Sequence, residues 1–357
     1  MLASTALARG GTWRHIEDLG LGLQRAGLEV TIGLLPAAVA LHRASERAGL
    51  RWEHLHRTLG RSIDLWHVHL HDTYDVRAFL ALAARRPAGR SVITEHLPHS
   101  HASDERLEPQ YPRTRYAREA KTAFKRTEFR LAAEVITVSA GASRFLEERY
   151  SLPAGTVTRV YNGVLAPDQP PALRPPDGRF RVVAIGSLDR QKGHDVLLEA
   201  ARRSAQDWQV TVVGTGGQLE SLRAAASGLA AGRVSFLGWV DDPGAHILAA
   251  DVMCMPSRWE SLGYAALEAG ALCRPVVASR IDGLDEIIVD GESGVLVAPD
   301  DPGELAAALD RLATSPELVA RYGRAAYARV REQFTMQGMV DGVLAAYGRA
   351  CSEAAER

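Results

Sequence analysis

The sequence predicts an α/β protein with two domains, each a parallel sheet covered by helices. Short apolar runs typical of strands alternate along the chain with segments that have the apolar periodicity of helices. Strands that alternate with helices in this way form parallel sheets. A chain of 357 residues is longer than a typical domain with a single hydrophobic core, so two domains are expected.

One composition shift marks the domain boundary. Residues 166–178 hold five of the 17 prolines, so they can continue neither a helix nor a central strand. We therefore expect an N-terminal domain over residues 1–165, a linker over 166–178, a C-terminal domain over 179–334 and a last helix over 335–357. The helical pattern of residues 303–349 breaks near 333–335.

Individual elements follow from the apolar periodicity. In the first domain we expect a helix at 13–25 and strands at 28–32 and 64–69. In the second we expect strands at 180–185, 208–213, 234–237, 250–256, 274–279 and 291–297.

Charge and cysteine usage limit the function classes. The net charge of −1 and the pI near 6.9 argue against a general nucleic-acid binder. Cys254, Cys273 and Cys351 have no disulfide spacing, and no stretch has the length of a signal peptide core or a membrane span. These features favour a cytoplasmic protein, with peripheral contact to a membrane left open.

Two acidic residues in the second domain are the most informative for function. Glu260 and Glu268 are eight positions apart, which on a helix points both carboxylates the same way at about 12 Å. Ser261, Leu262 and Gly263 would then form the first helical turn, whose N–H groups and dipole attract a diphosphate. A solvated helix with two unrelated acids is the alternative.

The segment around these glutamates resembles the donor site of the family 4 retaining glycosyltransferases. That resemblance rests on Pro256-Ser257, Glu260-Ser-Leu-Gly263, Glu268 and residues 290–297. Six further segments match in order: Gly10-Gly11, Thr94-Glu-His96, 136–139, 161–163, 186–193 and 234–238, with Lys192 inside the fifth. The resemblance implies the GT-B fold, in which two Rossmann-like domains face each other across a cleft.

The resemblance assigns roles in the second domain. Lys192 would meet the nucleotide diphosphate, Glu260 the hydroxyls of the donor sugar, and Glu268 the ribose hydroxyls. Gly238 would border the base, and the adjacent Trp239 is either a stacking surface or part of the core. Ser187 stands where many members carry arginine; Arg190 is either its replacement or a solvated loop cation.

The first domain would supply the rest of the site. Gly10 and Gly11 would let a loop pass close to the diphosphate, and His96 would lie near the anomeric carbon. His67, His69 and His71 alternate, so they share one face of a strand. Such a face can bind metal, but we favour a role toward the acceptor. By the resemblance, the last helix returns to this domain.

The implied reaction retains the anomeric configuration and needs no metal or other cofactor. No D-x-D pattern occurs in the chain, and Lys192 can supply the positive charge instead. The donor would be a UDP- or GDP-sugar, and the acceptor a carbohydrate, a lipid-linked sugar or a small molecule. A basic stretch in the first domain suggests either an anionic acceptor or a solvated helix: Arg113, Arg115, Arg118, Lys121, Lys125, Arg126 and Arg130.

Two features leave alternatives open. The resemblance places a central strand before Gly10, yet the first nine residues offer only a few apolar positions, so we expect that strand to be truncated and the natural start to lie upstream. A nucleotide-sugar epimerase of the same architecture and a non-catalytic sugar-binding protein are alternative functions. The glycine pattern at residues 214–217 suggests an NAD-dependent enzyme, but the match breaks at Leu219, where the third glycine of the dinucleotide-binding fingerprint should stand.

Overall fold

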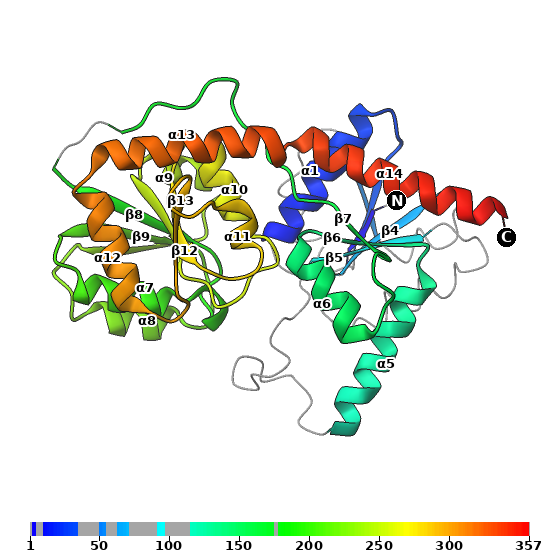
Figure 1. The fold of residues 1–357 in the computed structure, drawn as a ribbon, viewed down its shortest axis with the longest axis horizontal. Helices are drawn as coiled ribbons and strands as arrows, with labels where there is room; N and C mark the ends of the chain where they lie inside the picture. Colours follow the sequence, from blue (N-terminus) through cyan, green and yellow to red (C-terminus); the bar gives the residue numbers. More distant parts are fainter. Residues whose placement is uncertain are drawn as a thin grey trace. The chain divides into compact units, whose positions relative to one another are not determined.

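The chain folds into two compact units. A computed structural model describes residues 2–4, 10–34, 50–54, 63–70, 91–96, 115–174 and 178–356. Unit 1 comprises Met1–Gly163 with Met336–Arg357, and unit 2 comprises Val164–Thr335 (Figure 1). Both units are built on wholly parallel sheets between helices, which confirms the predicted α/β class.

The sheet of unit 1 has the strand order β3-β2-β1-β4-β5-β6-β7. The three-residue strand β1 lies between β2 and β4 and pairs with both. Its strands are β1 (Leu2–Ser4), β2 (Thr31–Leu34), β3 (Arg51–His54), β4 (Trp66–Leu70), β5 (Ser91–Glu95), β6 (Glu134–Thr137) and β7 (Val157–Arg159). Its helices include α1 (Gly11–Arg25), α5 (Arg115–Leu131), α6 (Ala140–Tyr150) and α14 (Met336–Glu356).

Alternation along the strands divides the core of unit 1 into two layers. Apolar residues of α1 and α14 pack with one face of the sheet, and those of α5 and α6 pack with the other. On β4, Trp66 and Val68 belong to the layer under α5 and α6. Successive strand residues point to opposite faces, so His67 and His69 lie on the α1 and α14 side. That face therefore carries polar groups inside a buried layer.

The sheet of unit 2 has the strand order β10-β9-β8-β11-β12-β13. Helices α7, α8 and α12 lie on one face, and α9, α10 and α13 on the other (Figure 1). The strands are β8 (Phe180–Ile185), β9 (Trp208–Val213), β10 (Val234–Gly238), β11 (Val252–Met255), β12 (Val276–Ser279) and β13 (Gly294–Val297). The helices are α7 (His194–Arg203), α8 (Leu219–Ala226), α9 (Pro243–Leu248), α10 (Tyr264–Ala271), α11 (Leu284–Ile287), α12 (Pro302–Ala313) and α13 (Pro316–Gln333), with a 3₁₀ turn at Arg190–Lys192.

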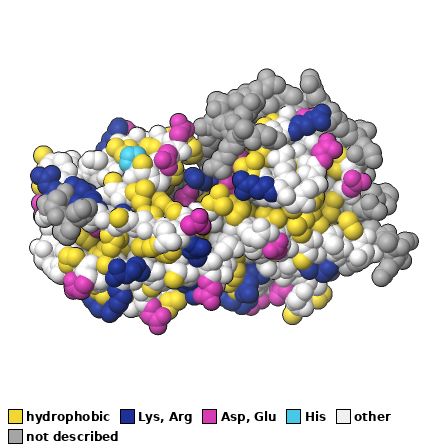
Figure 2. Space-filling view, turned by 90° about the horizontal axis from the view of Figure 1, so that it is seen from above, with side chains coloured by type: hydrophobic (Ala, Val, Ile, Leu, Met, Phe, Trp, Pro, Cys, Tyr) yellow, Lys and Arg dark blue, Asp and Glu magenta, His cyan; other side chains and the backbone are white. Residues whose placement is uncertain are grey.

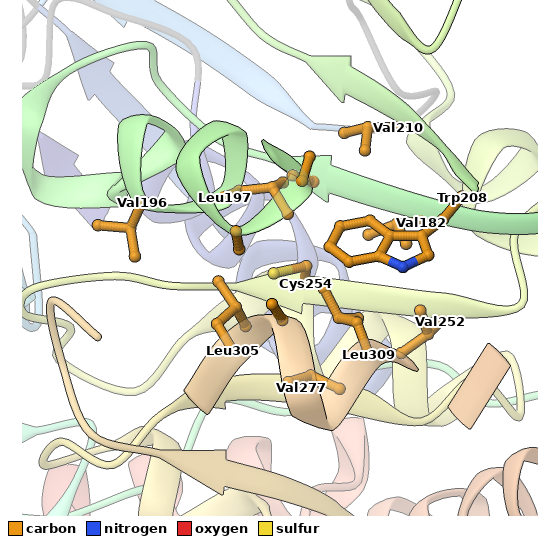
Figure 3. Packing of buried hydrophobic residues seen from close by; sticks show 14 of the residues in the cluster. Val182, Val196, Leu197, Trp208, Val210, Val252, Cys254, Val277, Leu305 and Leu309 are labelled. Atoms are coloured by element: carbon orange, nitrogen blue, oxygen red, sulfur yellow. The ribbon is translucent and has the colours of Figure 1, made fainter. Parts of the chain in front are cut away.

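Trp208 anchors the core of unit 2. It is fully buried and packs with branched aliphatic side chains of β8, β9, β11 and α12 (Figure 3). Its indole Nε1 donates to Asp310 Oδ1 on α12 at 2.7 Å, so the one polar atom of the ring is satisfied. This bond fixes α12 against the start of β9.

Helix starts in unit 2 follow local sequence signals. Helices α9 and α12 begin with proline after an aspartate whose side chain accepts backbone N–H bonds, at Asp242 and Asp301. Helix α13 begins with Pro316 after Ser315. The sequence predicted one break in the helical segment 303–349, at residues 333–335, and the structure confirms it between α13 and α14. A second break, at Thr314 and Ser315 between α12 and α13, was not predicted. The strand expected at 28–32 is β2, shifted to Thr31–Leu34.

A buried arginine joins the linker to unit 2. Arg274 is 1% exposed, and burial lowers the pKa of its guanidinium below the ordinary value. The guanidinium donates to four backbone carbonyls, at distances of 2.8 to 3.2 Å: those of Ala172, Leu248, Ala250 and Leu272. Ala172 belongs to the proline-rich segment, so this hydrogen bond attaches the segment at Ala172 to the body of unit 2.

The surface carries charges of both signs. On the face in Figure 2, Lys and Arg side chains are interspersed with Asp and Glu side chains, in keeping with the net charge of −1. Of the helices in the described ranges, none combines the length and the apolar character that crossing a bilayer requires.

We predict that Arg274→Met lowers the free energy of unfolding of unit 2 by about 3 kcal/mol or more, because it removes a buried guanidinium that donates to four backbone carbonyls. Urea unfolding followed by tryptophan fluorescence measures this change. Arg223→Met is the matched control, since Arg223 is an exposed residue that pairs with the exposed Glu220, and its effect should stay within about 0.5 kcal/mol. Equal effects of the two substitutions would contradict the role of Arg274.

Candidate functional site

Loops at one edge of the unit 2 sheet form the candidate site. Residues 186–193 follow β8, 214–218 follow β9, 256–263 follow β11 and 280–283 follow β12. These strands are parallel, so the loops emerge at the same edge, where ligands bind in open α/β sheets. Backbone hydrogen bonds join the first two loops, since Leu188 N donates to Thr215 O and Gln218 N to Leu188 O, both at 2.9 Å.

Two glycines allow these loops to touch backbone to backbone. A Cβ at Gly214 would lie 1.9 Å from the carbonyl oxygen of Gly186, and a Cβ at Gly193 would lie 2.0 Å from that of Pro256. Gly193 also has a φ of 64°, in the left-handed region that favours glycine. Only glycine therefore permits the contact between the first and third loops.

Lys192 and Glu260 meet at this edge. Lys192 Nζ lies 2.6 Å from Glu260 Oε1, and the same oxygen accepts a hydrogen bond from Ser257 Oγ at 2.9 Å. The two charged side chains are 20% and 6% exposed, respectively. Gly186 packs directly on the aliphatic part of Lys192, where a Cβ would meet Cγ at 3.1 Å. Two residues predicted from separate segments are thus brought together as a nearly buried ion pair.

The predicted helical spacing of Glu260 and Glu268 is wrong. Helix α10 begins at Tyr264, and Gly263 precedes it with a left-handed φ of 95°. Ser261 and Leu262 therefore belong to the loop, not to the first helical turn. A Cβ at Gly263 would lie 2.5 Å from Leu284 Cδ2, so packing against α11 favours glycine at the point where the chain turns into the helix.

The two glutamates consequently lie in different local structures, Glu260 in a loop and Glu268 in a helix. Glu260 is held in the loop by Lys192 and Ser257. Glu268 lies in the second turn of α10 and is partly buried. The first N–H groups of α10 have no acceptor within the helix, and these groups, rather than residues 261–263, form its positive end.

Arg258 is a structural residue of the site that the sequence pattern did not reveal. Its guanidinium donates to both carboxylate oxygens of Asp195, at 3.0 and 2.8 Å, and to Asp300 Oδ1 at 2.8 Å. Burial alone raises the pKa of Asp195, but the bonds from Arg258 hold it below its ordinary value. Arg258 also donates to the carbonyl of Arg190 at 2.7 Å, which fixes the third loop against the first. No periodicity signals such contacts between distant segments.

The remaining predicted residues of unit 2 lie around the same edge. Ser187 is exposed and donates to Asp189 Oδ2 at 2.6 Å, and the Asp189 side chain caps the turn that carries Arg190 and Lys192. Arg190 is exposed. Gly238 ends β10 with a φ of 74°, and its carbonyl accepts from Gly214 N at 2.8 Å.

Trp239, next to Gly238, lies outside the core. It is 49% exposed, and its indole Nε1 donates to Asp241 Oδ1 at 3.3 Å. The alternative that placed Trp239 in the core is therefore wrong.

The predicted residues of unit 1 lie near the start of α1 and the end of β5. Gly10 precedes α1 and its carbonyl accepts from Arg14 N at 3.1 Å, while Gly11 is the first helical residue; both are exposed. His96 follows β5 and is 5% exposed. Its Nε2 lies 3.0 Å from Nδ1 of His69. His71 lies outside the described residues.

Buried histidines surround His96. The ring of His15 on α1 packs edge-to-face against the ring of His96, with 4.6 Å between the ring centroids. Burial lowers the pKa of His15 to about 4, partly opposed by the nearby Asn162 side chain. Burial, reinforced by neighbouring histidines, also holds the pKa of His67 and of His69 well below the ordinary value. These imidazoles are neutral at pH 7, the form that binds metals, and ring nitrogens of His15, His69 and His96 lie within 4.8 Å of one another. The expected absence of a catalytic metal stays a prediction.

The predicted basic stretch is interrupted inside α5. Lys125 is fully buried, with Nζ at 2.9 Å from Glu95 Oε2 and 2.8 Å from Glu128 Oε2. Burial alone lowers the pKa of Lys125, but the two carboxylates together raise it above its ordinary value. The prediction that Lys125 belongs to a basic surface is therefore wrong. Arg126 donates to the carbonyl of Tyr150 at 2.7 Å. Arg113 lies outside the described residues.

Family comparisons cover both units. Residues 9–165 match Glycosyltransferase Family 4, and residues 179–315 match Glycosyl transferases group 1. The second match contains every loop of the edge described above. The chain belongs to the group 1, family 4 glycosyltransferases.

Individual relatives agree with this assignment. The chain is 32% identical over 222 residues to glycogen synthase of Mycobacterium tuberculosis, covering 60% of this chain and 53% of that protein. It is 36% identical over 186 residues to D-inositol 3-phosphate glycosyltransferase of Arthrobacter sp., covering 49% and 44%. The matches thus span about half the length of these relatives.

A solved structure shows the same fold. HepE of Anabaena, crystallised with UDP and glucose, superposes with a TM-score of 0.77 at 18% identity, covering 97% of this chain and 98% of HepE. The fold is GT-B.

We predict that Gly193→Ala destabilises unit 2 by about 2–4 kcal/mol, since the new Cβ would have to displace the Pro256 carbonyl at a left-handed φ. Chemical unfolding measures the loss. The matched control is Gly217→Ala in the second loop, because a Cβ there meets nothing within 4 Å. If the Gly193 variant is as stable as this control, the close approach of the two loops is wrong.

We predict that the protein loses stability as the pH falls from 6.5 toward 4. In this window the unfolded chain binds a proton at His15 that the native chain does not, because the native pKa is about 4 and the unfolded one is 6.5. Each such histidine contributes up to about 1.4 kcal/mol per pH unit. Unfolding free energies at several pH values should show a shallower slope for His15→Asn than for His246→Asn, a more accessible histidine of unit 2. Identical slopes would contradict the assignment.

Proposed function

We propose that the chain is a retaining glycosyltransferase that moves a sugar from a nucleotide-diphosphate sugar to a hydroxyl acceptor without a catalytic metal. The observation that carries this proposal is the Lys192–Glu260 pair at the carboxyl edge of the unit 2 sheet, 2.6 Å apart. The pair lies within the segment that matches group 1 glycosyl transferases. A diphosphate joined to a sugar requires a cation for the phosphates and a hydrogen-bond acceptor for the sugar hydroxyls. The pair places one group of each kind side by side.

Donor binding follows from the chemistry of these groups. The ammonium of Lys192 and the positive end of α10 would bind the diphosphate and stabilise the negative charge that grows on it as the sugar leaves. The carboxylate of Glu260 would accept hydrogen bonds from sugar hydroxyls, and that of Glu268 from the ribose. Before the donor binds, Glu260 and Lys192 neutralise each other, so neither charge is buried alone.

We propose that unit 2 is the donor-binding domain and unit 1 the acceptor-side domain. In unit 1, Gly10 and Gly11 leave the backbone open to a diphosphate, and His96 would lie at the reacting carbon. In unit 2, Gly238 and the accessible face of Trp239 would border the base. Because Ser187 is held by Asp189, Arg190 is the proposed second cation for the diphosphate.

Catalysis would consist mainly of positioning and electrostatics. In the retaining reaction the acceptor oxygen attacks the anomeric carbon on the face that the diphosphate leaves, and a phosphate oxygen of the donor takes the acceptor proton. The protein orients both reactants and stabilises the departing charge. Lys192 supplies positive charge at the diphosphate, which is the task a metal ion performs in other transferases.

The acceptor is proposed only as a class. A carbohydrate, a lipid-linked sugar or a small polyol fits the range of the relatives' names, which include a glycogen synthase and an inositol phosphate glycosyltransferase. The three cysteines are unpaired, which supports the cytoplasmic setting we propose, with membrane contact limited to the periphery. The relatives favour sugar transfer over an epimerase; a non-catalytic sugar-binding protein is the competing function, and turnover separates the two.

We predict that the chain binds UDP or GDP, and the corresponding sugar conjugate, with EDTA present throughout. Glu268→Ala should weaken that affinity about ten- to a hundredfold, because it removes charged hydrogen bonds to the ribose. Isothermal titration calorimetry of the wild type and the variant measures both affinities and identifies the base.

The control for this titration is Glu332→Ala, which removes an exposed glutamate from another helix of unit 2 and should leave the affinity unchanged. Release of the nucleoside diphosphate in the presence of an acceptor then distinguishes an enzyme from a binding protein. Absence of binding to every nucleotide tested would refute the donor site.

A further inference from the structure

Four histidines of unit 1 form one buried cluster. His15 comes from α1, His67 and His69 from β4, and His96 follows β5; none is more than 5% exposed. The ring centroids of His67 and His69 are 4.2 Å apart, and those of His69 and His96 are 5.2 Å apart and stacked. The rings therefore contact one another in sequence across the sheet, and His96 is at one end.

Hydrogen bonds give this cluster a direction. The two ring nitrogens of His67 are both engaged: Nδ1 lies 2.8 Å from the Tyr347 hydroxyl of α14, and Nε2 lies 2.6 Å from Thr94 Oγ1. His69 packs on this fixed ring and contacts Nε2 of His96 through its Nδ1, at 3.0 Å. The C-terminal helix is thus connected to His96 through two intervening imidazoles.

We propose that His69 is a positioning residue that holds the ring of His96, and that Tyr347 supports it through His67. The proposal rests on the proposed function, in which His96 lies at the reacting carbon. An imidazole suits this task because it can fix a neighbouring ring by a hydrogen bond without adding a charge beside an anionic donor. A carboxylate in its place would favour the protonated, cationic form of His96.

The geometry also assigns the proton between His69 and His96. Nε2 of His69 has no hydrogen-bond partner in the part of the chain that the structure describes. If His96 donated to Nδ1 of His69, that Nε2 would be a buried N–H without an acceptor, which is rarer in proteins than an unused lone pair. His69 Nδ1–H is therefore the donor, and His96 accepts at Nε2 and carries its proton on Nδ1.

Three substitutions separate positioning from a merely structural role. In His69→Asn the side-chain amide can place an N–H where Nδ1 stands, so turnover should stay within about threefold of the wild type. His69→Leu keeps the bulk but removes the donor, and a misplaced reacting group should lower kcat about ten- to a hundredfold. Tyr347→Phe should lower kcat less than His69→Leu does. KM for the donor should not change, because neither His69 nor Tyr347 is among the residues proposed to bind the nucleotide.

A spectroscopic readout makes the test independent of turnover. The ¹⁵N shifts of the His96 ring report which nitrogen is protonated, and we expect the Nδ1–H form in the wild type and in His69→Asn. In His69→Leu we expect a mixture of both tautomers, at a temperature where circular dichroism shows the variant folded.

The outcomes distinguish this proposal from the proposed function. Wild-type kcat in folded His69→Leu, or an unchanged His96 tautomer there, would overturn the positioning role while leaving sugar transfer intact. Full activity in His96→Ala would remove the role of His96 itself and the positioning role with it. Activity that is lost in EDTA and restored by zinc would show that the protein needs a metal, for which His15, His69 and His96 are candidate ligands, and would overturn the proposal.

Discussion

The candidate site depends on direct contact between backbones of loops that are far apart in sequence. At three glycines, the position that a Cβ would occupy is already filled by a backbone carbonyl oxygen of another loop. The pairs are Gly193 with Pro256, Gly214 with Gly186, and Gly283 with Ser261. Because these contacts leave no space for a Cβ, the loops have one relative arrangement, and Lys192 and Glu260 follow from it. The ion pair is therefore a product of backbone packing rather than of mutual attraction between two mobile side chains, whose net gain would be small.

The sequence predicted the α/β class, most strands of unit 2 and the residues that gather at its sheet edge. Strand predictions succeeded because parallel strands are buried on both faces and read as short apolar runs, as in β11 and β12. The start of α10 could not be placed, since the left-handed conformation of Gly263 depends on its contact with Leu284, which is remote in sequence. For the same reason the bonds of Arg258 to Asp195 and Asp300 left no local pattern.

In unit 1, alternation correctly placed His67 and His69 on one face of a strand, because side-chain direction in a strand is a local property. The partners of that face come from elsewhere. His15 arrives from α1, and Tyr347 arrives from the other end of the chain, 280 residues after His67. Lys125 shows the opposite error: a cation in a basic stretch was read as surface, but two carboxylates that no local pattern links to it compensate its burial.

The path of the chain makes the two units unequal as modules. Unit 2 is one continuous segment, and its ends meet where Val164 pairs with Thr335 in an isolated bridge. Unit 1 is interrupted, because α14 belongs to it although the helix is made last. Unit 2 is thus an insertion into unit 1, with entry and exit points side by side. If unit 2 binds the donor as proposed, exchanging this one continuous segment between related proteins would exchange donor specificity, whereas a fragment ending at Gly163 lacks the helix that packs on its sheet and carries Tyr347.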